Sequence, residues 1–487
     1  MLKHYIQWLK GLQSATSPFL VGDDDLSLMS NVNTSYKLGA IIKRLGYKQV
    51  GSTLQADKSI LGLHNFRQNA STQKMLATCD DSTGDDTQLF RSTGGAWTEV
   101  TAAETAWAGK AGINVEMEDF IGYCFIVGWG ATDGFIPFCS FKDTTTFSDS
   151  TNVDGALEAK FIKRYRDRLY LANLNDGGAL PYRVAISDLP SGSTLGWTEY
   201  QADTGWLDVD YSEAITGLGS NWDRLMIFTE YSAYMYDQNT QKKVWDIGCS
   251  NHRTIKNSGA YMFWANMDGV WQSSGGRPIN ISGRVTDFIK YATPTSFFAE
   301  VVDEEYHLYV GDVTVNGIAY SNCSIIYNIA TQSWRVHEYY DTLTTLGKFY
   351  SSGDDRLYLG CSDGEVMEMT KYQDTTPVYS DDGANISALW ETKAFDLGDP
   401  SIEKNIQKIK FYADKAQGLG IKAMIIDKNT RALNKIVDLG TLKSYITSPN
   451  FKSLKGNFIK FIGTETSKLP YFSFFGMSVL FEPNTKL

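Results

Sequence analysis

The chain has 487 residues, of which 43% are hydrophobic and 13% aromatic, and its formal net charge is −11. This length exceeds one ordinary core and is enough for two domains, and the aromatic-rich composition excludes a long disordered region. The acidic balance argues against a simple nucleic-acid binder, because such proteins carry basic stripes.

Cysteines and apolar stretches indicate where the chain folds. No two cysteines form a Cys-x-x-Cys pair, so we predict buried free thiols in a protein folded in a reducing cytosol. The cysteines are Cys79, Cys124, Cys139, Cys249, Cys323 and Cys361. No apolar stretch approaches the roughly 20 residues of a membrane helix, and no secretory signal begins the chain, so membrane insertion is not expected.

Residues 1–30 are expected to form an N-terminal arm. Their first part, to about Leu12, reads as a short amphipathic helix, and turns follow at Pro18 and Asp23. The arm carries apolar side chains that water would otherwise surround, which predicts that it docks on a neighbouring subunit or another ring. These side chains are Tyr5, Ile6, Trp8 and Leu9.

Seven short apolar runs recur further along the chain, each followed by a polar turn and a second strand. The runs begin at Lys74, Tyr123, Asp167, Asp223, Ala260, Glu305 and Asp355. Their mean spacing of about 47 residues is typical of a β-propeller blade, which cannot bury its own apolar faces alone. Because the runs are apolar on both faces, we predict that they are the inner blade strands. A β-propeller of about seven blades is therefore predicted over residues 31–375.

Three repeats lead from an aromatic residue to a tryptophan. The pairs are Phe90 with Trp97, Tyr236 with Trp245, and Tyr327 with Trp334. We interpret each tryptophan as a packing anchor stacked over the aromatic ring on a returning strand, rather than as a sugar-binding platform. The acidic residues that precede arginine in three runs are interpreted as turn residues rather than catalytic carboxylates. They are Asp167, Asp223 and Asp355.

The pattern changes after about residue 372. Residues 375–377 and 380–383 read as a linker, and the segments that follow alternate between apolar and polar positions. Such alternation indicates strands with one solvent-exposed and one buried face, so we predict a separate antiparallel β-sandwich over residues 384–487. Residues 401–487 are also rich in lysine, which leaves the negative charge in the propeller half.

Motifs of catalysis and of metal binding are missing. Residues 191–197 lack the aspartate of a sialidase-type turn, and Glu213 stands where a calcium loop beginning at Asp208 needs glycine. The histidines share no metal-ligand spacing, and there is no phosphate loop or nucleophile elbow. They are His4, His64, His252, His307 and His337. We therefore expect no enzymatic activity, no catalytic, cofactor-binding or metal-binding residues, and no cofactor.

The order of these features resembles the tail hub, or nozzle, proteins of short-tailed bacteriophages (podoviruses), also called phage stabilisation proteins. The resemblance is carried by the arm, residues 31–33 and 39–47, turns such as residues 266–271, and the sandwich opening at residues 390–398. It implies a structural virion protein that assembles in the host bacterial cytoplasm, as a homo-oligomer of six copies, into the tail.

The resemblance also implies the partners. The hexamer lies below the portal and adaptor rings, extends the channel for DNA, retains the genome and anchors tail fibres or spikes. Genomic DNA passes without specific binding, because a carboxylate-lined lumen repels phosphates over about 8 Å at physiological salt.

Two other hypotheses stay open. A receptor- or glycan-binding propeller is favoured if aromatic side chains are exposed in the loops between blades. A glycosidase needs two carboxylates about 5 to 10 Å apart in the axial funnel.

Overall fold

The computed structural model describes the chain except for residues 1, 7–9, 35, 37–38, 93–94, 143–146, 149–156, 192–194, 352, 416–417, 427–432, 443–445, 448, 450–453, 468–471 and 484–487. Strands dominate the described residues, which confirms the all-β prediction. The helices are short: α1 (Thr101–Ala106), α2 (Thr198–Gln201), α3 (Thr286–Lys290), η1 (His252–Thr254), η2 (Ser282–Arg284) and η3 (Pro294–Ser296). No helix in this part of the chain is long and apolar enough to cross a membrane.

Antiparallel strands follow one another in units of four, and the described residues contain seven such units. The first unit contains β7 (Ile60–Arg67), β8 (Gln73–Asp80), β9 (Thr87–Ser92) and β10 (Trp97–Glu99). The second contains β11 (Asn114–Phe120), β12 (Tyr123–Gly130), β13 (Gly134–Phe141) and β14 (Phe147–Ser148). The third contains β15 (Glu158–Tyr165), β16 (Arg168–Asn175), β17 (Ala179–Ile186) and β18 (Trp206–Asp208). One residue pair, Pro137 with Glu158, joins the second and third units into a single sheet.

The remaining units continue this order. They are β19 (Ile215–Asn221), β20 (Arg224–Thr229), β21 (Ala233–Tyr236) and β22 (Gln241–Trp245); β23 (Lys256–Ser258), β24 (Tyr261–Asn266), β25 (Gly269–Ser273) and β26 (Ile279–Asn280); β27 (Phe298–Val302), β28 (Glu305–Val315), β29 (Ile318–Asn328) and β30 (Ser333–Glu338); and β31 (Leu343–Ser351), β32 (Asp354–Cys361) and β33 (Val366–Met369). An N-terminal strand, β6 (Tyr47–Gln49), pairs with β33 as the fourth strand of the last unit.

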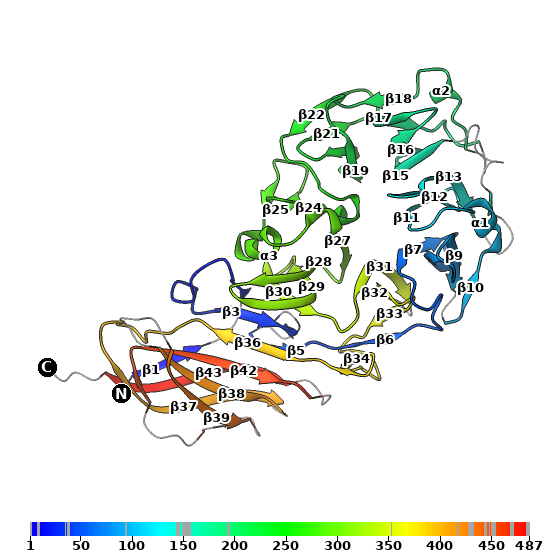
Figure 1. The fold of residues 1–487 in the computed structure, drawn as a ribbon. Coiled ribbons are helices and arrows are strands. Elements are labelled where there is room, and N and C mark those ends of the chain that lie inside the picture. The colour runs from blue at the N-terminus through cyan, green and yellow to red at the C-terminus, as the bar shows by residue number, and fades with distance from the viewer. Residues whose placement is uncertain are drawn as a thin grey trace.

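The units are arranged around a common centre (Figure 1). The first strand of each unit lies on the inside, and β31 of the last unit packs beside β7 of the first. The strand β6 comes from before the first unit and hydrogen-bonds to the last one, so the two ends of the repeated region are held together.

The seven apolar runs form the second strands of the units, each with a hydrogen-bonded strand on both sides, which agrees with the prediction of inner strands. The strand that precedes each run was not predicted. The runs coincide with β8, β12, β16, β20, β24, β28 and β32, and those that begin at Asp167, Asp223 and Ala260 start one residue before the strand. A second strand has hydrogen-bonded neighbours on both sides and packed sheets on both faces, which explains its continuous apolarity. The innermost strands alternate in burial, as β7 does, and for that reason they gave no comparable signal.

Aromatic packing in the outer strands agrees with the sequence in part. Trp334 on β30 lies 5.0 Å from Tyr327 between ring centroids, as predicted. Trp245 instead stacks on Trp264, at 5.7 Å and 8° between the planes, and Trp264 is fully buried. All six cysteines are free and buried, which confirms the prediction for the thiols.

The remaining strands form two sheets that pack against each other. One contains β4 (Val32–Asn33), β5 (Ile41–Lys43), β43 (Ser473–Pro483), β37 (Lys404–Lys415) and β40 (Ile446–Thr447), with β1 (Leu2–Ile6) on β43 and β41 (Leu454–Gly456) on β37. The other contains β3 (Asp25–Ser30), β36 (Ala388–Thr392), β42 (Phe458–Glu465), β38 (Gly420–Ile426) and β39 (Leu433–Thr441). Trp390 and Phe474 stack between them at 5.3 Å.

The N-terminal arm belongs to these two sheets, which corrects the expectation of a helix. Its first residues form the strand β1, paired with β43, and not a helix; Trp8 and Leu9 lie outside the described residues. The short strand β2 (Gly11–Leu12) pairs with both β3 and β30, so one sheet runs from the sixth unit into the C-terminal strands. The C-terminal part therefore shares a sheet with the sixth unit and a hydrophobic core with the fifth and sixth units. The predicted limits at residues 30, 375 and 384 stay a prediction.

Two buried ion pairs hold the junction between the two parts. Arg44 binds both carboxylate oxygens of Asp381, in the hairpin of β34 (Ser380–Asp381) and β35 (Ala384–Asn385), and Lys43 binds Glu465 on β42. The predicted linker is thus a fixed element. Gly46 passes so close to it that a Cβ atom would lie 1.8 Å from the Ser380 carbonyl oxygen.

Candidate functional site: a central cavity

A polar cavity of about 260 Å³ lies where the units meet. Its lining residues come from the first strands of all seven units, together with η1. A second cavity of about 550 Å³ adjoins it, and the two share Glu116, His252, Arg253 and Phe298. We call them the central cavity and the side cavity.

Charged pairs between neighbouring units line the central cavity. Glu118 on β11 binds Lys163 on β15, with 2.7 Å between Oε2 and Nζ. Lys256 on β23 lies 3.3 Å from Glu300 on β27. Each pair joins two neighbouring units, so carboxylates and ammonium groups balance one another around the wall.

His252 has a defined tautomer. Its Nδ1 accepts a hydrogen bond from the Leu218 backbone N–H at 3.1 Å, so Nε2 carries the proton and faces Glu116 at 3.5 Å. Burial lowers the pKa of His252, which keeps the imidazole neutral near pH 7. The protonated Nε2 of His252 therefore lies beside a carboxylate.

Unlike Lys163 and Lys256, Arg253 has no carboxylate partner among the described residues. It donates to the Thr344 carbonyl oxygen at 3.1 Å, and its guanidinium lies 5.1 Å from the centre of the Phe298 ring. Burial lowers the pKa of Arg253, although Glu116 opposes the shift. A guanidinium with free donors at the meeting point of two cavities can bind an anion.

The side cavity contains a tryptophan ring, Trp129, and a further cation, Lys160. Lys160 lies 3.9 Å above the ring of Trp129, and burial lowers the pKa of this lysine. Amide side chains of Asn173 and Asn251 complete the polar part of the wall. The side cavity therefore offers a cation beside an indole ring, whereas the amide groups of Asn173 and Asn251 donate to the carbonyl oxygens of Ile215 and Thr295.

Residues that the sequence singled out lie elsewhere and have structural partners. Arg166 and Asp223 form an ion pair on the surface between the third and fourth units, and Arg356 binds Asp374 at 2.6 Å. Asp208, at the discounted calcium loop, makes a two-fold contact with Arg183 at 2.8 and 2.9 Å. Of the three aspartates interpreted as turn residues, Asp223 thus binds an arginine, and Asp355 lies within β32, 3.7 Å from Lys348. That none of the three is catalytic stays a prediction.

Sequence reasoning missed the residues of both cavities. Residues 114–118 alternate between polar and apolar positions, which is a strand signal with one polar face, and Glu116 and Glu118 share that face. His252 and Arg253 lie in a short helical turn and carry no periodic signal. Comparison with models of known protein families and with curated proteins finds no match to this sequence.

Proposed function

We propose that the seven units form a β-propeller, followed by a β-sandwich that also takes up the N-terminal arm. The packing of β31 beside β7 and the lining of one cavity by all seven first strands support the ring. The pairing of β6 with β33 supports its closure, since propellers gain stability when distant segments complete the last blade.

In this proposal the protein is a structural component of a phage tail, a hub or nozzle of six copies in the virion. It extends the DNA-exit channel below the portal and adaptor rings, retains the genome and anchors fibres or spikes. DNA passes through the lumen without specific binding. The protein has no enzymatic role.

The observation that carries this proposal is the edge strand β39. It ends the longest sheet, at the side of the sandwich remote from the ring (Figure 1). Its Leu433 and Ile436 side chains are 47% and 52% exposed. An exposed edge strand with apolar side chains is a template for pairing with another chain, and monomeric proteins usually block such an edge. We assign β39 to contact with a second copy of this chain.

Charge supports assembly as well. Residues 401–487 contain 13 lysines and one arginine against six acidic residues, a net charge of +8, which leaves −19 for residues 1–400. Opposite charges on the two parts favour contact between the sandwich of one copy and the ring of another.

The glycosidase alternative is weakened by the partners of the cavity carboxylates. Glu118 has an ammonium partner, and Glu116 faces the N–H of His252. A glycosidase needs one carboxylic acid that stays protonated in apolar surroundings, and a cationic partner opposes this.

The experiment is native mass spectrometry of the purified chain and of the variant Ile436→Glu. The wild type should give a hexamer, and the variant should shift to smaller species, because a charge replaces an apolar contact. Met267→Glu is the matched control, since Met267 is 68% exposed on a turn of the ring; it should leave the hexamer intact. A wild type that stays monomeric at micromolar concentration contradicts the proposal.

Exposed aromatics favour a second candidate function, a receptor- or glycan-binding propeller. Tyr211, Tyr291 and Tyr340 lie in connections between units and are 69%, 59% and 69% exposed. Rings of this kind stack on sugars. A glycan array tests it: binding that Tyr340→Ala abolishes supports this function, and no bound glycan opposes it.

A further inference from the structure

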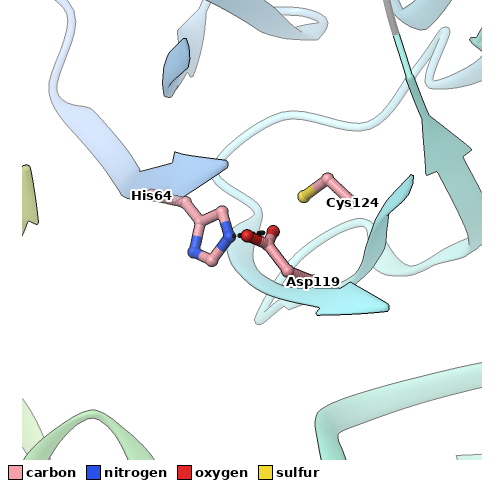
Figure 2. Close-up of side chains that lie close together, drawn as sticks. All are labelled: His64, Asp119 and Cys124. Atoms are coloured by element: carbon pink, nitrogen blue, oxygen red, sulfur yellow. Dashed lines mark hydrogen bonds and ion pairs between the residues drawn. The ribbon is translucent and has the colours of Figure 1, made fainter. Parts of the chain in front are cut away.

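Three potential metal ligands meet where the first and second units touch. They are His64 on β7, Asp119 on β11 and Cys124 on β12, and their donor atoms all lie within 4.8 Å of one another. Figure 2 shows the three side chains pointing toward one another, with a hydrogen bond between His64 and Asp119. That bond joins Nε2 and Oδ1 at 2.7 Å.

The fold brings these residues together through two separate contacts. Asp119 and Cys124 are directly opposite in the β11–β12 hairpin, so their side chains share one face. His64 comes from the neighbouring unit, because β7 packs beside β11. The Asp119 carboxylate is also fixed by its second oxygen, which accepts the Arg67 backbone N–H at 2.7 Å. A ligand held by a further hydrogen bond is typical of a metal site.

The same atoms do not form a catalytic triad. In a triad, the histidine binds the carboxylate with one nitrogen and the nucleophile with the other. Here Nε2 binds Asp119 and lies on the side of Cys124, whereas Nδ1 points away from both (Figure 2). His64 therefore cannot carry a proton between the thiol and the carboxylate, and the convergence of the donors needs another explanation.

We propose that His64, Asp119 and Cys124 bind a zinc ion that links the first two units. Imidazole, carboxylate and thiolate are the ligands that zinc takes, whereas calcium and magnesium prefer oxygen alone. At tetrahedral zinc, with bonds of about 2.0 to 2.3 Å, neighbouring donors lie about 3.3 to 3.6 Å apart. To reach this arrangement, the distance between His64 Nε2 and Asp119 Oδ1 lengthens from 2.7 Å, and the longest of the three donor–donor distances shortens.

Two of the three ligand side chains reach solvent, whereas Cys124 is buried. The side chains of His64 and Asp119 are 23% and 29% exposed, and His64 lines the central cavity, which gives the ion a path and a water molecule the fourth position. Binding replaces the thiol proton of Cys124, and the His64 proton moves from Nε2 to Nδ1. One proton is released for each ion bound.

The test is a titration of the full-length, chelator-treated protein with Co²⁺, followed by displacement with Zn²⁺. One Co²⁺ per chain should bind and give a thiolate-to-cobalt charge-transfer band, which Zn²⁺ removes. His64→Gln should weaken binding more than about tenfold, and Cys124→Ala should abolish the band. His64→Gln keeps a donor toward Asp119 and changes a partly exposed residue, so it tests the site if Cys124→Ala fails to fold.

The matched control is Cys79→Ala, which removes a buried thiol of the first unit outside this cluster. It should bind Co²⁺ as the wild type does. The proposal is wrong if the wild type shows no thiolate band, or if His64→Gln binds Co²⁺ with unchanged affinity and spectrum.

Discussion

Acidification between pH 6.5 and pH 4 should destabilise the protein through a buried histidine of the sixth unit. Burial in β28 lowers the pKa of His307 to about 4 from the usual 6.5, although Glu305 opposes the shift. In the folded state the imidazole stays neutral down to about pH 4, whereas the unfolded chain takes up a proton near pH 6.5. Stability is therefore complete above pH 6.5 and is lost as the pH falls toward 4.

The size of the stability loss follows from the pKa shift of His307. A difference of about 2.5 units corresponds to about 3 kcal/mol, at 1.36 kcal/mol per unit. The His307 side chain is only 9% exposed, so solvent screens little of this effect. His337 on β30 adds in the same direction, because burial lowers its pKa well below the usual value. Below pH 4.5 a further loss follows from Glu305, whose pKa Arg335 lowers to about 2 against the opposing effect of burial.

The assay is urea unfolding followed by tryptophan fluorescence at pH 7.5 and pH 4.5. His307→Gln is neutral at both pH values, so it should lose less stability on acidification than the wild type, by about 2 to 3 kcal/mol. His4→Gln serves as the control, because it removes an imidazole on β1, outside the sixth unit. An equal loss in wild type and His307→Gln refutes the reasoning.

Three further variants test the packing. Trp264→Ala removes a fully buried ring whose Nε1 donates to the Gly248 carbonyl oxygen at 3.2 Å; it should cost about 3 to 5 kcal/mol in urea unfolding, and a loss below about 1 contradicts its place in the core. Lys43→Met leaves the Glu465 charge buried and unpaired; it should cost about 3 to 5 kcal/mol, and the double variant with Glu465→Leu should recover most of that loss. Gly46→Ala meets the Ser380 carbonyl oxygen at 1.8 Å; calorimetry should show a lower melting temperature, and an unchanged one contradicts the close approach.

The sequence predicted the repeated units because their second strands are apolar on both faces. Runs such as residues 169–172 stand out without any structural knowledge. The first strands were missed because one face is polar and lines the central cavity, as Glu116 and Glu118 do on β11. An alternating strand of this kind resembles any surface strand until its neighbours are known.

The pairing of strands that lie far apart in the chain could not be predicted from the sequence, for a different reason. The strand β1 pairs with β43 across almost the whole chain, and nothing in residues 2–6 encodes the partner. The cluster of His64, Asp119 and Cys124 likewise depends on the packing of two units. Spacing along the chain therefore gave no metal-ligand pattern for these residues.

Electron microscopy of the purified full-length protein tests the central claim most directly. The proposal predicts closed six-fold rings in which each subunit shows a seven-bladed ring joined to a smaller β-rich lobe. Isolated single subunits at the same concentration, or subunits without a closed ring of seven blades, would contradict it.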